Sequence, residues 1–156
     1  MDDSYIDLED ADVTLYAESV GDEVGSSLAA AGDVDGDGRA DVLLGAWASK
    51  VGGANAGRAY LIYGTTLASN SEVLLSEADV TFNGEDTDNR AGYAIAGPGD
   101  IDGDGNDDIV FYQGNIRVYQ STEVIRGNLT VLLNDDCAGS FSEDAVYTTG
   151  DIVWNF

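Results

Sequence analysis

The sequence predicts an all-β fold, and two features of its patterning lead to that prediction. Apolar residues come in short runs of four to seven, such as 41–47 and 58–63, bounded by Gly, Asp and Asn. Short apolar runs between turn-forming residues are typical of strands. No window keeps apolar residues at helical spacing over three turns, and 20 glycines with a single proline indicate many tight turns.

The chain also repeats itself at an offset of 67 residues. An ungapped alignment of 11–46 with 78–113 gives 14 identities in 36 positions. The most complete match is 32–38 (GDVDGDG), which recurs as 99–105 (GDIDGDG). A weaker, incomplete echo follows at 145–152. Because a fixed period is the signature of repeated structural units, we expect two full units and part of a third.

Each full repeat predicts about four antiparallel strands. We expect them at 12–17, 26–31, 41–47 and 57–63 in the first repeat, and at 79–83, 92–97, 108–112 and 115–120 in the second. Four-stranded units of this length are typical of β-propeller blades, which stack because a single blade cannot bury both of its faces. The expected organisation is an acidic N-terminal segment (1–10), a first blade (11–66), a linker (67–77), a second blade (78–121) and a partial third blade (122–156).

Two loops with the pattern D-x-D-x-D-G-x-x-D carry the clearest chemistry. Alternate carboxylates on a tight turn can converge on one point, and the glycines permit positive φ. Crowded carboxylates repel one another unless a cation lies among them, and oxygen ligands without nitrogen or sulfur favour calcium. We therefore expect about two calcium ions, with a backbone carbonyl completing each ligand set. The expected ligands are Asp33, Asp35, Asp37, Arg39 (carbonyl) and Asp41 in the first loop, and Asp100, Asp102, Asp104, Asn106 (carbonyl) and Asp108 in the second.

Two other structures could explain these loops. Asp-Gly pairs also make hairpin turns that hold no ion, although identical spacing in two loops favours the metal site. An EF-hand loop begins with the same residues but needs a Glu at position 12 and flanking helices. Position 12 is Leu44 in the first loop and Phe111 in the second, within strand-like apolar runs. The sequence therefore disfavours an EF-hand.

Charge and missing residue types exclude several classes of function. Acidic residues outnumber basic ones 30 to 6, so the net charge is −24. Nucleic acids and anionic membranes would be repelled, whereas cations would be attracted. The absence of histidine excludes His-based acid–base catalysis and His-ligated zinc. The single cysteine, Cys137, excludes an internal disulfide and a Cys-clustered metal site.

Targeting signals are sparse. No apolar run approaches 18 residues, so we expect no membrane insertion. Met1 is followed by two aspartates rather than a basic and then an apolar region, so we expect no signal peptide within the sequence. The triplet Asn128-Leu129-Thr130 matches a glycosylation acceptor, a pattern that is common by chance.

Short elements flank the first loop in a fixed order. Gly25 lies ahead of it, and Gly45, Ala46 and Trp47 follow it, while Gly92 lies ahead of the second loop. This arrangement resembles the FG-GAP repeat of the integrin α-subunit N-terminal β-propeller. In that family a Phe-Gly element precedes a D-x-D-x-D-G-x-x-D calcium loop, which leads into Gly-Ala-Pro. The resemblance extends over roughly residues 11–120.

The resemblance implies a seven-bladed propeller stiffened by calcium loops, in secreted or cell-surface settings. We therefore expect a non-enzymatic, calcium-binding β-propeller module for extracellular adhesion, ligand binding or scaffolding. It would take a protein or carbohydrate ligand, and it would self-associate or form part of a longer propeller. The alternative is the propeller portion of a carbohydrate-active enzyme such as a polysaccharide lyase, which turnover of a polysaccharide would reveal.

Overall fold

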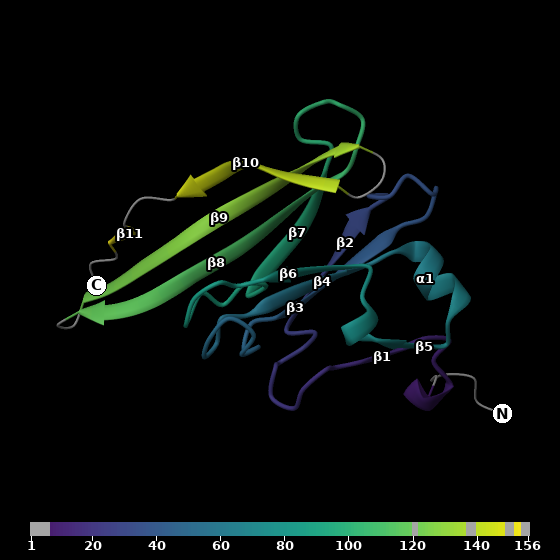
Figure 1. The fold of residues 1–156 in the computed structure, drawn as a ribbon, viewed down its shortest axis with the longest axis horizontal. Coiled ribbons are helices and arrows are strands. Elements are labelled where there is room, and N and C mark those ends of the chain that lie inside the picture. Colours follow the sequence, from purple (N-terminus) through teal and green to yellow (C-terminus); the bar gives the residue numbers. More distant parts are fainter. Residues whose placement is uncertain (1–6, 120–121, 137–139, 149–151, 154–156) are drawn as a thin grey trace.

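The computed structural model describes residues 7–119, 122–136, 140–148 and 152–153. These residues form mainly antiparallel sheets with little helix (Figure 1). The prediction of an all-β fold is confirmed. The described residues contain two larger sheets and no closed propeller, so the expected number of blades stays a prediction.

The first sheet has four strands in the order β2-β3-β4-β6, and every neighbouring pair is antiparallel. Its strands are β2 (Ser27–Gly32), β3 (Asp41–Ala46), β4 (Arg58–Ile62) and β6 (Val80–Asn83). Both faces of this sheet are apolar. Leu43 and Leu61 lie on one face, and Leu44 and Tyr60 on the other, all of them buried. A sheet with two buried faces needs a covering layer on each side.

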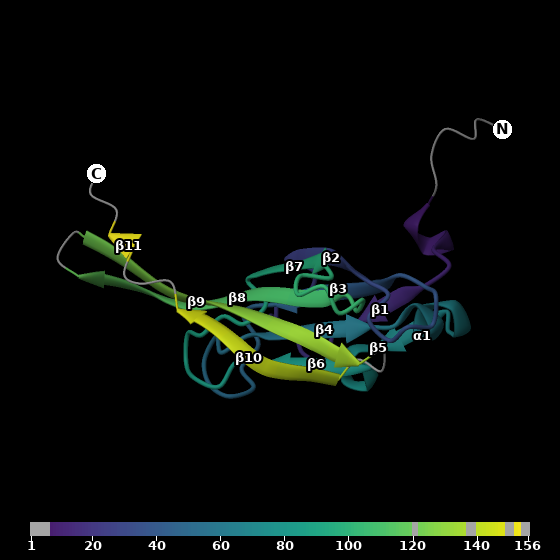
Figure 2. The same cartoon turned by 90° about the horizontal axis from the view of Figure 1, so that it is seen from above.

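The second sheet has the strand order β10-β9-β8-β7. Its strands are β7 (Ala94–Gly99), β8 (Asp108–Tyr119), β9 (Thr122–Asp136) and β10 (Ser140–Thr148), and β11 (Ile152–Val153) pairs with β9 near its start. Pairing between β7 and β8 reaches only to Tyr112, but β8 and β9 remain paired as far as Tyr119. This hairpin therefore extends beyond the rest of the sheet (Figure 2).

Short elements cover the outer face of the first sheet. They are the 3-10 turn η2 (Leu75–Glu77), the helix α1 (Gly64–Ser69), and the parallel strand pair β1 (Thr14–Tyr16) and β5 (Glu72–Leu74). A further 3-10 turn, η1 (Leu8–Asp10), precedes β1 and is exposed. Val73 and Leu75 from this layer pack with Tyr60 and Ile62 of β4 in one buried cluster. Among the described residues, no helix is long and apolar enough to cross a membrane.

The strand predicted at 12–17 is present as β1, but its predicted pairing is wrong, and so is the division of 108–120 into two strands. Segment 12–17 was expected in the first sheet, but β1 pairs with β5, and its repeat equivalent β6 supplies the fourth strand of that sheet. Segments 108–112 and 115–120 were expected as two strands, but β8 is continuous. Gly114 does not end the strand because it pairs with Gly127 on β9. Consequently β9 and β10, from the region expected to begin a third blade, complete the second sheet.

The two sheets pack face to face, with β2 lying beside β7 (Figure 1). Their shared core contains Leu43 and Leu61 from the first sheet and Ile109, Phe111 and Leu132 from the second. Burial of these side chains is the main apolar stabilisation that joins the two sheets.

Glycines allow the backbones of the two sheets to approach closely. A Cβ added at Gly97 would lie 2.2 Å from the carbonyl oxygen of Ala30. One added at Gly45 would lie 2.0 Å from the carbonyl oxygen of Gly92 and 2.1 Å from Ser27 Oγ, which donates to that same carbonyl at 2.7 Å. No larger residue fits at these positions without moving the sheets apart.

The close approach at Gly45 predicts that Gly45→Ala strongly lowers the free energy of unfolding. The backbone at Gly45 is not in the left-handed region. The expected loss of about 3 kcal/mol in the free energy of unfolding would therefore come from overpacking alone. Gly21→Ala is the matched control, because its φ is +87° but open space surrounds it, and backbone strain should cost about 1 kcal/mol. Urea unfolding of both variants checks the order. A Gly45→Ala protein as stable as the parent would contradict this packing.

Candidate metal centre

The two aspartate loops occupy equivalent places in the two sheets. The first joins β2 to β3, and the second joins β7 to β8, so each closes the hairpin formed by an edge strand and its neighbour. Gly36 and Gly38 have φ values of +74° and +86°, and Gly103 and Gly105 have +85° and +95°. Because L side chains rarely adopt this left-handed backbone, the glycines of the motif are required by the shape of the turn.

The ninth residue of the first loop, Asp41, anchors the loop to the sheet. Its side chain is fully buried. Oδ2 accepts a hydrogen bond from the amide of Val34 at 2.8 Å, and Oδ1 accepts one from the amide of Gly64, which follows β4, at 2.7 Å. Burial raises the pKa of this carboxyl, while these two amide donors and the nearby charges act as smaller influences on it. Asp41 therefore holds together the start of the loop and the start of helix α1, which follows β4.

Asp108 has the same role in the second loop. It is also fully buried. Its Oδ2 accepts from the amide of Ile101 at 2.7 Å, and its Oδ1 accepts from the amide of Asn134 on β9 at 2.9 Å. The two repeats thus use equivalent buried carboxylates, Asp41 and Asp108, in the same way. The second amide donor follows β4 in the first repeat and lies on β9 in the second.

Three further hydrogen bonds also recur from one loop to the other. In the first loop, the amides of Asp37, Gly38 and Arg39 donate to Asp35 (3.1 Å), Asp33 (2.9 Å) and Asp37 (2.8 Å), respectively. In the second loop, the amides of Asp104, Gly105 and Asn106 donate to Asp102 (3.1 Å), Asp100 (2.9 Å) and Asp104 (2.8 Å). This duplicated network shows that the two loops share one fold.

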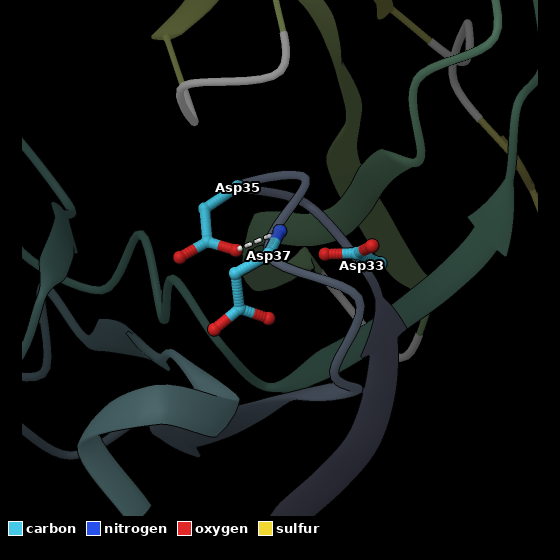
Figure 3. Close-up of side chains that lie close together, drawn as sticks. All are labelled: Asp33, Asp35 and Asp37. Atoms are coloured by element: carbon cyan, nitrogen blue, oxygen red, sulfur yellow. Dashed lines mark hydrogen bonds between the residues drawn. The ribbon is translucent and has the colours of Figure 1, made fainter.

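The loops bring carboxylates close together. In the first loop, one oxygen from each of Asp33, Asp35 and Asp37 lies within 4.8 Å of the others (Figure 3). In the second loop, the corresponding group is Asp100, Asp102 and Asp108. Asp104 is not in the second group, and its two oxygens accept hydrogen bonds from the backbone and side-chain amides of Asn106, at 2.8 Å each. Each cluster offers oxygen atoms alone, which suits a hard cation.

The electrostatics of both clusters favour an added positive charge. The amide of Asp104 lowers the pKa of Asp102, but desolvation and the charges of Asp104, Asp108 and Asp100 outweigh it, so the pKa is raised overall. In the first loop, Asp33 Oδ1 is buried and accepts no hydrogen bond within the described part of the chain. A buried carboxylate oxygen without a donor is costly unless a cation or another donor satisfies it.

Arg39 and Asn106 lie in the turns where the sequence places them. Arg39 is exposed, and its Nε is 4.0 Å from Asp37 Oδ2. The amide groups of Arg39 and Asn106 both donate to the carboxylates of their loops. The role expected for their carbonyl oxygens as calcium ligands stays a prediction.

Sequence reasoning missed two residues that join the loops. Asp107 Oδ2 accepts from the amide of Asp33 at 2.8 Å, and Asn134 Nδ2 donates to the carbonyl of Val34 at 2.7 Å. The motif gives no sign of Asp107, because the matching residue of the first loop is Ala40. Asn134 carries a weak signal, since it is a polar residue directly after the apolar pair 132–133.

Comparison with known families agrees with the first loop and its flanking strands. Residues 24–62 match the family model of the FG-GAP repeat. This segment is therefore similar to the FG-GAP repeat. The match spans β2, the first aspartate loop, β3 and β4, and the resemblance predicted from the sequence is confirmed there. No curated protein matches the chain. The likeness of the second loop to this FG-GAP repeat rests on the duplicated hydrogen bonds.

The contacts of the first loop predict different roles for two of its aspartates in metal-free protein. Asp41→Ala would leave the amides of Val34 and Gly64 without their acceptor, at a cost of about 2–5 kcal/mol. Asp35→Ala removes one exposed hydrogen bond and relieves repulsion, so it should cost less than about 1 kcal/mol. Urea unfolding in excess EDTA compares the two. Equal losses in the free energy of unfolding for the two variants would contradict the anchoring role of Asp41.

Proposed function

We propose that the chain is a calcium-binding module, with one calcium ion in each aspartate loop. The observation that carries the proposal is the duplicated loop, in which several carboxylates converge and Asp33 Oδ1 is buried without a donor among the described residues. A cation supplies what that oxygen lacks and offsets the repulsion within each cluster.

The donor set favours calcium over other metal ions. Every side-chain ligand that the two clusters offer is a carboxylate oxygen. Calcium accepts six to eight oxygens in flexible geometry, whereas zinc and copper prefer nitrogen or sulfur. The ligands proposed for the first loop are Asp33, Asp35, Asp37 and Asp41 with the Arg39 carbonyl, and those proposed for the second are Asp100, Asp102, Asp104 and Asp108 with the Asn106 carbonyl.

The role proposed for the module is non-enzymatic and extracellular, in adhesion, ligand binding or scaffolding. The FG-GAP repeat at 24–62 supports this role, because that family implies propellers with calcium loops at one rim. The edge strands support a further contact with another chain or another blade. Leu28 of β2 is 65% exposed, and no strand pairs with the free edge of β2 or β7 in the described residues. Unpaired edges of this kind favour self-association or inclusion in a longer propeller.

Calcium should stabilise the folded chain. Each site contributes about 2.7 kcal/mol when free calcium is a hundredfold above the Kd. Extracellular modules often have a Kd of about 10⁻⁴–10⁻³ M, so millimolar calcium is required. We expect the melting temperature to rise with calcium and to fall with EDTA, and we expect the double variant Asp35→Ala/Asp102→Ala to lose most of the response. A melting curve that excess EDTA leaves unchanged would rule out the proposal.

Magnesium should substitute poorly for calcium. It requires near-ideal octahedral geometry at shorter distances and gives up its water reluctantly, whereas these loops present an irregular set of carboxylates. Titration calorimetry of the metal-free chain with each chloride salt measures the difference. Sodium chloride at matched ionic strength is the control, because screening acts on exposed charges without regard to ion identity. Equal affinity for magnesium and calcium would count against the assignment.

A further inference from the structure

A carboxylate of the second loop reaches into the first. Asp107 lies next to the anchoring residue Asp108, but its own side chain points to the other repeat, where Oδ2 accepts from the amide of Asp33 at 2.8 Å. Asp33 is also the residue whose Oδ1 is buried without a donor among the described residues. The position of Asp107 therefore sets the position of a proposed ligand of the first calcium ion.

The fold keeps space for this contact. A Cβ added at Gly32 would lie 2.0 Å from Asp107 Oδ2 and 2.5 Å from its Cγ, and φ of Gly32 is +82°. A residue with a side chain at position 32 would meet both a clash and backbone strain. The strand pairing is irregular between Ala30 and Gly32, immediately before the first loop. This irregularity and the glycine bring the backbone of the first loop against the second.

Asn134 makes a second connection between the loops. Its side chain is 1% exposed, and its Nδ2 donates to the carbonyl of Val34 at 2.7 Å and to the carbonyl of Asp107 at 3.3 Å. Its own amide donates to Asp108 Oδ1 at 2.9 Å. One buried residue thus contacts the anchor of the second loop and the backbone of the first.

We propose that calcium binding at the two loops is positively coupled through Asp107 and Asn134. The inference rests on the proposed function, since it requires that both loops bind calcium. An ion in the second loop would fix Asp108 and its neighbour Asp107, which in turn would hold the amide of Asp33. The first loop then loses less conformational freedom when its own ion binds. By thermodynamic linkage, the first ion favours the second by the same factor.

The test is a thermodynamic cycle measured by titration calorimetry of the full chain with calcium chloride. Asp102→Ala isolates the first loop, and Asp35→Ala isolates the second. The coupling factor is the product of the two association constants of the parent chain divided by the product of the two single-loop constants. We expect a factor of about fivefold or more in the parent chain. Asp107→Ala, introduced into all three backgrounds, should bring it to about one.

Three further variants separate coupling from a general structural effect. Asp107→Asn keeps an oxygen that can accept from Asp33 and should retain most of the coupling. Asp107→Ser is too short to reach and serves as a second disrupting variant if Asp107→Ala folds poorly by circular dichroism. Asp86→Ala is the charge control, because Asp86 is exposed and follows β6 at the end of the first sheet away from the loops. It should leave the coupling factor unchanged.

Two results would overturn the inference while leaving the proposed function intact. One is a coupling factor of one in the parent chain, with both loops binding calcium independently. The other is an Asp107→Ala variant that weakens the single-loop affinities but leaves the coupling factor at its parent value. If neither loop binds calcium, both the coupling and the proposed function are wrong.

Discussion

The rest of the structure depends on one interaction, the buried carboxylate that closes each aspartate loop. Asp41 and Asp108 are completely shielded from solvent, and each accepts two backbone amides from different parts of the chain. A buried charge is stable only where such donors compensate its lost hydration. These hydrogen bonds restrain the two ends of the turn, and the other carboxylates of the loop lie near one another. The cluster is a consequence of the anchor.

The same arrangement also causes repulsion between the clustered carboxylates of each loop. The chain carries a net charge of −24, and the loops concentrate part of that charge into two small volumes. The two loops are also joined, because the close packing of β2 on β7 brings Asp107 against the backbone of Asp33. A cation bound in each loop, as proposed above, would offset this repulsion. The packing between the sheets therefore determines how close the two charged loops lie to each other.

The sequence was sufficient to identify the loops but not their surroundings. The D-x-D-x-D-G-x-x-D spacing contains both the carboxylates and the glycines that the turn needs, so the local geometry follows from short-range chemistry. Strand pairing is a long-range property. The local pattern predicts a strand at 79–83, but it does not predict that this strand completes the first sheet. The sequence predicts separate strands at 108–112 and 115–120, yet β8 continues through Gly114, which pairs with Gly127 on β9. The roles of Asp107 and Asn134 could not be predicted, since they arise only when the two loops meet, although a polar residue after an apolar pair is a weak signal for Asn134.

The most direct measurement of the central claim is the amount of calcium that the chain retains. Protein equilibrated with millimolar calcium and passed through a short desalting column equilibrated in calcium at about the expected Kd can be assayed by elemental mass spectrometry. With two intact loops, we expect between one and two calcium ions per chain at that concentration, rising to about two at saturation. A content at saturation no greater than that of the Asp35→Ala/Asp102→Ala variant would contradict the account.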